Sequence, residues 1–216
     1  MRISTPHAVH LLHAAPFATL ATQAINFPGH PYATPVPNVP DAAHCPLLLV
    51  SALAEHTKNL LADPKVSLSY VEPRSTDVQA AARLTLVGDA ERLDPDDELV
   101  EHYLRYQPDS AHYLELDFMF FRVVPKRLRF IEGIGRMGWI EAADWSLLPA
   151  LDADSERAAL QELTGRLPDG VTVLGIDTFG IDLRRGEQRA RHAFGEPWAS
   201  PAVLAAMIAH WAAGLA

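Results

Sequence analysis

The feature that most constrains the fold is a run of short alternating segments between residues 17 and 140, separated by turn-forming residues. Hydrophobic alternation and β-branched content predict strands over residues 17–22, 32–37, 47–51, 66–71, 83–93, 118–124 and 127–131. A short helix is expected before them, over residues 7–15, and only short helices fall between them, over residues 56–61 and 99–106. This order favours an antiparallel barrel over alternating βαβ units.

The composition changes after residue 145. The pattern there predicts a helix over residues 155–164, strands over residues 171–176 and 179–183, and an alanine-rich helix over residues 201–213. We therefore expect two domains, a barrel over residues 1–145 and a small α+β domain over residues 146–216. The fold class is mainly β, with α+β character.

Charge and composition exclude several function classes. The formal net charge is -9, which opposes attraction to nucleic-acid phosphates. No segment approaches the roughly 20 apolar residues that span a bilayer, and the N-terminus lacks the apolar run of a signal peptide. One cysteine, Cys45, excludes an intrachain disulfide and a multi-cysteine metal site. We expect a cytoplasmic protein with no nucleic-acid or membrane partner.

Residues 51–60 are the segment most suited to binding an anion. Polar residues where a strand opens into a helix can present backbone amides, a hydroxyl and an ammonium group to one phosphate. The alternative is a helix cap, in which Ser51 or Glu55 satisfies the helix amides and Lys58 is solvated. The residues alone leave both interpretations open.

The histidines suggest two further hypotheses. His7, His10 and His13 lie three residues apart and could ligate a metal, but we expect solvated surface histidines and no metal site. His192, beside Arg189 and Arg191, could belong to a cationic site for haem propionates or to an exposed basic strand. No spacing of catalytic groups identifies a general acid, base or nucleophile.

Several segments together resemble one known family. Residues 51–68 contain Ser51, then His-Thr-Lys-Asn-Leu, Asp-Pro and Val-Ser-Leu. They resemble the flavin-phosphate segment of pyridoxamine-phosphate-oxidase-like split barrels, nearest the haem-utilisation branch. Residues 31–36, 83–88 and 133–139 resemble further segments of that branch in the same order. The resemblance covers about residues 10–140.

The resemblance implies a split β-barrel that binds FMN at the interface of a homodimer. It implies that Thr34, His56, Thr57 and Lys58 hold the phosphate, with Lys58 contributing most. The backbone of Ala33, Pro35 and Val36 would follow the isoalloxazine ring and ribityl chain, and Ser51 would lie near the ring or phosphate. The expected function is that of an FMN-dependent oxidoreductase acting on a small molecule, with its catalytic residues unidentified.

Two other functions stay open. The chain could be a haem-binding or haem-utilisation protein, or it could be a non-catalytic protein that binds a partner. The expected helix over residues 155–164 departs from the family because it lacks that branch's His-Met-Asn and Asp-His pattern. The glycines of residues 133–138 could serve a ligand or a tight barrel corner, and they do not form a dinucleotide-binding fingerprint.

Overall fold

The computed structural model describes residues 3–133, 135–163 and 166–195. The chain divides into two compact units, Met1–Leu148 and Pro149–Ala216. The helix expected over residues 201–213 lies outside the described residues. None of the helices in the described ranges combines the length and apolar character needed to cross a membrane.

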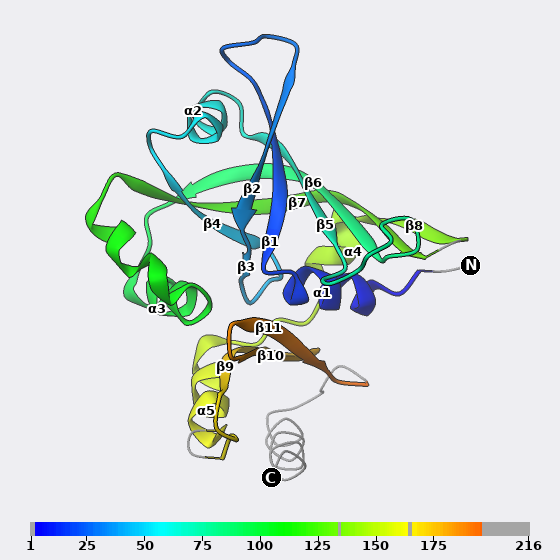
Figure 1. The fold of residues 1–216 in the computed structure, drawn as a ribbon, viewed down its shortest axis with the longest axis vertical. Helices are drawn as coiled ribbons and strands as arrows, with labels where there is room; N and C mark the ends of the chain where they lie inside the picture. The colour runs from blue at the N-terminus through cyan, green and yellow to red at the C-terminus, as the bar shows by residue number, and fades with distance from the viewer. Residues whose placement is uncertain (1–2, 134, 164–165, 196–216) are drawn as a thin grey trace. The chain divides into compact units, whose positions relative to one another are not determined.

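The N-terminal unit is built on one antiparallel sheet that is not closed (Figure 1). Its strands run in the order β2 (Pro31–Pro37), β1 (Phe17–Gln23), β5 (Lys65–Val71), β6 (Arg83–Leu93), β7 (Phe118–Gly133), β4 (Pro46–Ser51) and β3 (Val39–Pro40), and β8 (Arg136–Glu141) also pairs with β7. The open, curved sheet confirms the predicted split-barrel fold. Strands β3 and β8 were not predicted.

The prediction of two strands over residues 118–124 and 127–131 is wrong, because β7 is continuous. Pro125 interrupts the sequence pattern, but it lies opposite Gly88, where the pairing of β6 with β7 shifts register. A Cβ atom at Gly88 would come within 2.4 Å of the Val124 carbonyl oxygen. Glycine and a bulge therefore allow proline inside this long strand.

Two glycines of the glycine-rich segment lie at the end of β7 and just before β8. Gly133 and Gly135 have φ angles of 145° and 79°, which favour glycine. Gly135 leads directly into β8, which pairs back along β7. This arrangement favours the tight-corner interpretation of the segment.

Apolar side chains from the alternating strands form the core of this unit. Those with almost no exposure include Leu20, Leu47, Leu68, Tyr70, Leu84, Leu86, Phe121, Leu128 and Phe130. The helical segments are α1 (Thr5–Ala14), α2 (Glu55–Ala62), α3 (Asp97–Tyr106), the 3-10 helix η1 (Pro108–Glu115) and α4 (Ala142–Ser146). Helix α1 packs against β3, β5 and β6.

The C-terminal unit contains helix α5 (Ala153–Leu163) packed on β9 (Val171–Asp177). Strand β9 pairs with β10 (Gly180–Arg185), which pairs with β11 (Gln188–Ala193). Its core is made by Leu151, Ala159, Leu163, Ile176, Ile181, Leu183 and Phe194.

Candidate functional site

The candidate site lies where strand β4 ends and helix α2 begins. Ser51 is the last residue of β4, and α2 starts at Glu55. Helix α2 contacts β1 and the edge strand β2, and β2 also contacts β4. The two groups of predicted cofactor residues, residues 33–36 and 51–58, therefore lie on neighbouring elements (Figure 1).

Helix α2 lacks a side-chain cap at its N-terminus within the part of the chain that the structure describes. Its N-cap residue is Ala54, which makes no side-chain cap hydrogen bond. The first amides of an α-helix have no partner inside the helix, and they carry the positive end of the helix dipole. An anionic group placed at this end would be favoured electrostatically.

The helix-cap interpretation of Ser51 and Glu55 is wrong. The Ser51 hydroxyl oxygen accepts a hydrogen bond from the Leu53 amide at 3.2 Å, within the turn that precedes the helix. The Glu55 carboxylate accepts one from the Asn26 side-chain amide at 2.5 Å, in the connection between β1 and β2. Both side chains are thus engaged before the helix or beside it.

Thr57 has the most informative side chain of the site. It is fully buried, and its hydroxyl has no hydrogen-bond partner among the described residues. A buried hydroxyl without a partner costs free energy, so most native structures satisfy such a group with protein, water or ligand. Thr57 lies in the first turn of α2, at the helix end that carries the positive part of the dipole.

Lys58 and His56 contribute differently to this end of α2. The Lys58 side chain is half-exposed, and its Nζ lies 4.0 Å from a Glu55 carboxylate oxygen, a weak pair at a solvated position. Burial lowers the pKa of His56, which favours the neutral imidazole. Among the predicted phosphate residues, Lys58 therefore carries the positive charge.

Strand β2 leaves much of its surface open, because it lies at the end of the sheet and pairs only with β1. Ala33 and Pro35 are exposed, Thr34 is half-buried, and Val36 is buried. The Thr34 hydroxyl donates a long hydrogen bond, 3.5 Å, to the Pro35 carbonyl oxygen. A ligand can therefore approach this strand at residues 33–35, while Val36 offers it only backbone.

Asn59 and Thr22 are residues of this region that sequence reasoning missed. Asn59 Oδ1 accepts from the Ile25 amide at 3.1 Å, and its Nδ2 donates to Thr22 Oγ1 at 2.9 Å. Both side chains are buried. The sequence signal that could have identified Asn59 was its position beside Leu60, where a polar side chain falls on the apolar side of a short helix.

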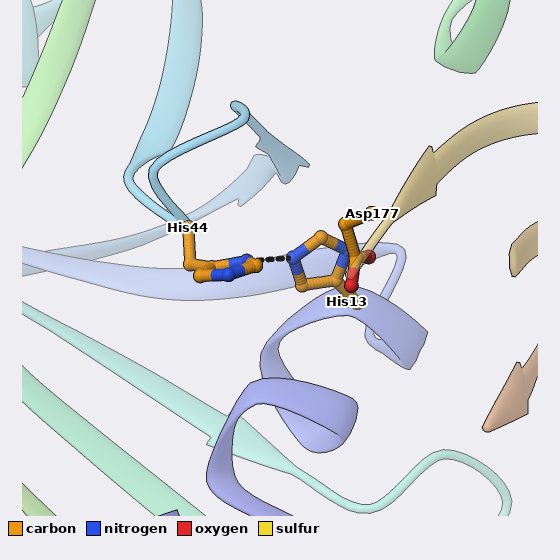
Figure 2. A group of neighbouring side chains, drawn as sticks. All are labelled: His13, His44 and Asp177. Carbon is orange, nitrogen blue, oxygen red and sulfur yellow. Dashed lines mark hydrogen bonds between the residues drawn. The ribbon is translucent and has the colours of Figure 1, made fainter. Parts of the chain in front are cut away.

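A buried histidine pair lies elsewhere in the N-terminal unit. His13 Nε2 and His44 Nδ1 are 2.9 Å apart (Figure 2), and the ring of His44 meets that of Trp145 edge-on. His13 is thus not a solvated surface residue, which corrects the expectation. His7 is exposed, but its Nδ1 is hydrogen-bonded to the Glu132 carboxylate of β7.

The basic side chains of β11 are neither exposed nor free to bind propionates. Arg191 bonds to Asp182 at 2.6 Å and to Asp177 at 2.9 Å, and its side chain is 3% exposed. Burial opposes the charge of Arg191, but the two carboxylates outweigh this effect and raise its pKa. Arg191 is therefore unavailable for the suggested cationic site with Arg189 and His192, because its charge is neutralised within its own sheet.

Cys45 is a buried thiol of the N-terminal unit. Burial, with a smaller effect from the Asp41 carboxylate, raises its pKa to about 12. The thiolate is therefore scarce at neutral pH, which is typical of a structural cysteine and not of a reactive one.

Comparisons with known proteins identify relatives of both units. The family model for pyridoxamine 5'-phosphate oxidase matches residues 4–132. A chloroplastic heme oxygenase, HOZ, of Arabidopsis thaliana is 36% identical over 118 residues, which are 53% of this chain and 36% of that protein. The match thus spans about a third of the length of that curated relative.

Two solved structures match over nearly the whole chain. A heme binding protein from Mycobacterium smegmatis is 28% identical, with a TM-score of 0.62 and 99% of each chain covered. A protein of unknown function from Agrobacterium tumefaciens is 24% identical, with a TM-score of 0.76 and coverage of 94% of this chain and 93% of that chain. The second likeness concerns the fold alone.

Proposed function

This chain belongs to the pyridoxamine 5'-phosphate oxidase family, and from that premise we propose that it binds FMN as a homodimer and acts as an FMN-dependent oxidoreductase on a small molecule. The observation that carries this proposal is the fully buried Thr57 hydroxyl, which has no partner among the described residues. It lies in the first turn of a helix whose N-terminus no side chain caps.

The residues at the start of α2 fit a phosphate group. A phosphate dianion needs several converging donors, because removing its charge from water is otherwise costly. Backbone amides of the first turn, the Thr57 hydroxyl and the Lys58 ammonium would supply them. The neutral His56 imidazole would add a hydrogen bond, and Ser51 would lie beside the phosphate or ring.

The open strand β2 fits the remainder of the cofactor. Ala33 and Pro35 are small or rigid exposed residues, so a planar ring could approach the backbone of residues 33–36 closely. FMN would supply the redox chemistry, and the protein would bind and orient the cofactor and its substrate. The substrate class follows only from the family, because no described group is placed as a catalytic acid or base.

Exposed apolar side chains near the site support the homodimer. Phe27 and Leu53 have exposed fractions of 69% and 80%. Phe17, Ile25, Tyr32 and Leu61 are also exposed, and all six belong to β1, β2, α2 or the connections beside them. Exposed apolar side chains gathered on these elements are typical of a protein interface.

The visible absorption spectrum of the purified protein tests the proposal. After incubation with FMN and desalting, we expect flavin bands in the wild type and their loss in Lys58→Ala. Lys65→Ala is the matched control, because Lys65 is an exposed lysine that pairs with Asp63 on the surface. A desalted wild type without flavin bands would contradict FMN binding.

Haem binding is the second candidate, and the identity to the Arabidopsis heme oxygenase and the Mycobacterium heme binding protein favours it. In this case the same protein, incubated with haem instead of FMN, would show a sharp Soret band. If that band were retained through desalting and FMN were not, haem binding would replace FMN binding as the proposed function.

A further inference from the structure

Two buried polar side chains join helix α2 to the sheet beside the proposed phosphate site. Asn59 lies on α2, and Thr22 lies on β1; their exposed fractions are 0% and 2%. Asn59 Nδ2 donates to Thr22 Oγ1 at 2.9 Å, while Asn59 Oδ1 accepts from the Ile25 amide at 3.1 Å. The Asn59 side chain is thus hydrogen-bonded both to Thr22 within β1 and to the backbone just after that strand.

The connection continues into strand β2. Thr22 and Tyr32 are paired across β1 and β2, and the Thr22 hydroxyl donates to the Tyr32 carbonyl oxygen at 3.4 Å, a long hydrogen bond. Tyr32 immediately precedes residues 33–36, the proposed flavin strand. A chain of hydrogen bonds therefore runs from α2 through β1 to β2.

A second contact acts on the same side of the helix. Glu55 and Asn59 are four residues apart, so they share one helix face. Asn26, the residue after Ile25, donates to the Glu55 carboxylate at 2.5 Å. Two consecutive residues of the β1–β2 connection thus hold two successive turns of α2, which fixes the rotation of the helix about its axis.

We infer that Asn59 is a positioning residue for the phosphate site, acting through Thr22; this inference rests on the proposed FMN binding. Its side chain is occupied by Ile25 and Thr22. It holds α2 so that the Thr57 hydroxyl and the first-turn amides face a ligand lying along β2. Strand β2 stays paired with β1 over residues 31–37 without the long Thr22–Tyr32 bond. Loss of the Asn59–Thr22 link therefore weakens phosphate binding and leaves contacts to the flavin ring in place.

The ratio of the dissociation constants for riboflavin and FMN isolates this effect, because riboflavin lacks the phosphate. Both constants would be measured by quenching of flavin fluorescence on the full chain. We expect Asn59→Ala and Thr22→Val to weaken FMN binding by about tenfold, because each substitution removes one or two of the hydrogen bonds that position α2. Riboflavin binding should be unchanged. Thr22→Ser retains the hydroxyl and should keep the wild-type ratio, as should the surface control Lys65→Ala.

The outcomes separate the inference from the proposed function. A wild type that does not prefer FMN to riboflavin overturns both. A wild type that prefers FMN, with Thr22→Val unchanged, overturns the positioning role alone. Equal weakening of both flavins in Thr22→Val and Thr22→Ser also overturns it, since that result indicates general damage to the fold. Thr22→Val decides the question if Asn59→Ala does not fold.

Discussion

His13 Nε2 lies 2.9 Å from His44 Nδ1, and neither imidazole is exposed to solvent by more than 2%. One of these nitrogens must donate and the other must accept, so the bonded nitrogens cannot both carry a proton. His44 adopts a left-handed backbone conformation, with φ at 58°, in a turn held by the Asp41 carboxylate. The pair therefore ties helix α1 to the turn between β3 and β4.

The first prediction concerns the strength of this tie. Replacing His13 by phenylalanine leaves a buried polar ring without this partner, which should lower the free energy of unfolding by about 1–3 kcal/mol. Urea denaturation at pH 7.5 would measure the change. His44→Asn is the second substitution of a double-mutant cycle, because asparagine tolerates the left-handed conformation. The cycle should give a coupling energy of about 0.5–1.5 kcal/mol between the two histidines. Simple additivity of the two substitutions would contradict the pair's contribution.

The second prediction concerns pH. Burial lowers the pKa of His56 in the folded protein below its usual value of 6.5. In the window between the two values the unfolded chain binds the proton more readily, so His56 contributes stability above that window and loses it as pH falls. The urea midpoint of the wild type should therefore drop more than that of His56→Gln between pH 7.5 and more acid conditions.

The comparison with His56→Gln is essential because the chain has ten histidines. Acidification acts on the other nine in both proteins, and only the difference between the two curves reports His56. Parallel curves for the two proteins would show that folding does not shift the pKa of His56.

The third prediction concerns the C-terminal unit. The Arg191 guanidinium is buried between Asp177 and Asp182, with exposed fractions of 3%, 5% and 1% for the three side chains. Arg191→Met leaves two buried carboxylates without this cation, which should destabilise the unit by about 3–5 kcal/mol. Hydrogen exchange of the β10 amides would report the loss. Arg185→Met, at an exposed position of β10, is the control and should change little.

The sequence predicted the elements whose patterns are local and uninterrupted. The expected strand over residues 83–93 has the observed bounds of β6, because its alternation is continuous and turn residues flank it. The break expected in β7 came from Pro125, and only the partner strand shows that Gly88 and a register shift accommodate it. Three strands were not predicted. Strand β3 is very short, β8 begins within the glycine-rich segment, and β11 is strongly basic.

The candidate site was predictable in part for the same reason. Residues 51–58 form a local strand-to-helix signal, so the start of α2 was expected within one residue of its position at Glu55. The link from Asn59 to Thr22 spans 37 residues of sequence, and nothing local marks it. Likewise, only the folded structure shows that the buried Thr57 hydroxyl has no hydrogen-bond partner within the described ranges, whereas Arg189 and Arg191 of β11 pair with carboxylates.

The fourth prediction concerns the proposed homodimer. Phe27 is 69% exposed in the single chain, and burying such a side chain contributes about 1.5–3 kcal/mol. A dimer contains two copies, so Phe27→Asp should raise the dimer dissociation constant by at least about 100-fold. Sedimentation equilibrium would measure it. Leu147→Asp, also at a highly exposed apolar position, is the control, and a wild-type monomer would contradict the dimer.

The fifth prediction separates a ligand-binding hydroxyl from a structural one. Thr57→Val replaces the hydroxyl by a methyl group of similar size, at a position with no exposure and no hydrogen-bond partner among the described residues. Without FMN, the variant should be as stable as the wild type or more stable, because it removes a buried polar group that nothing satisfies.

The same substitution should weaken FMN binding. A hydrogen bond to a charged group contributes about 1.5–3 kcal/mol, which corresponds to a loss of about 10- to 100-fold in affinity. Thermal unfolding without ligand and fluorescence titration with FMN would measure the two effects on one preparation. Thr57→Ser keeps the hydroxyl and should bind FMN nearly as the wild type does. If Thr57→Val instead lost stability and bound FMN normally, the hydroxyl would serve the fold, and the phosphate would have to be held by the amides and Lys58 alone.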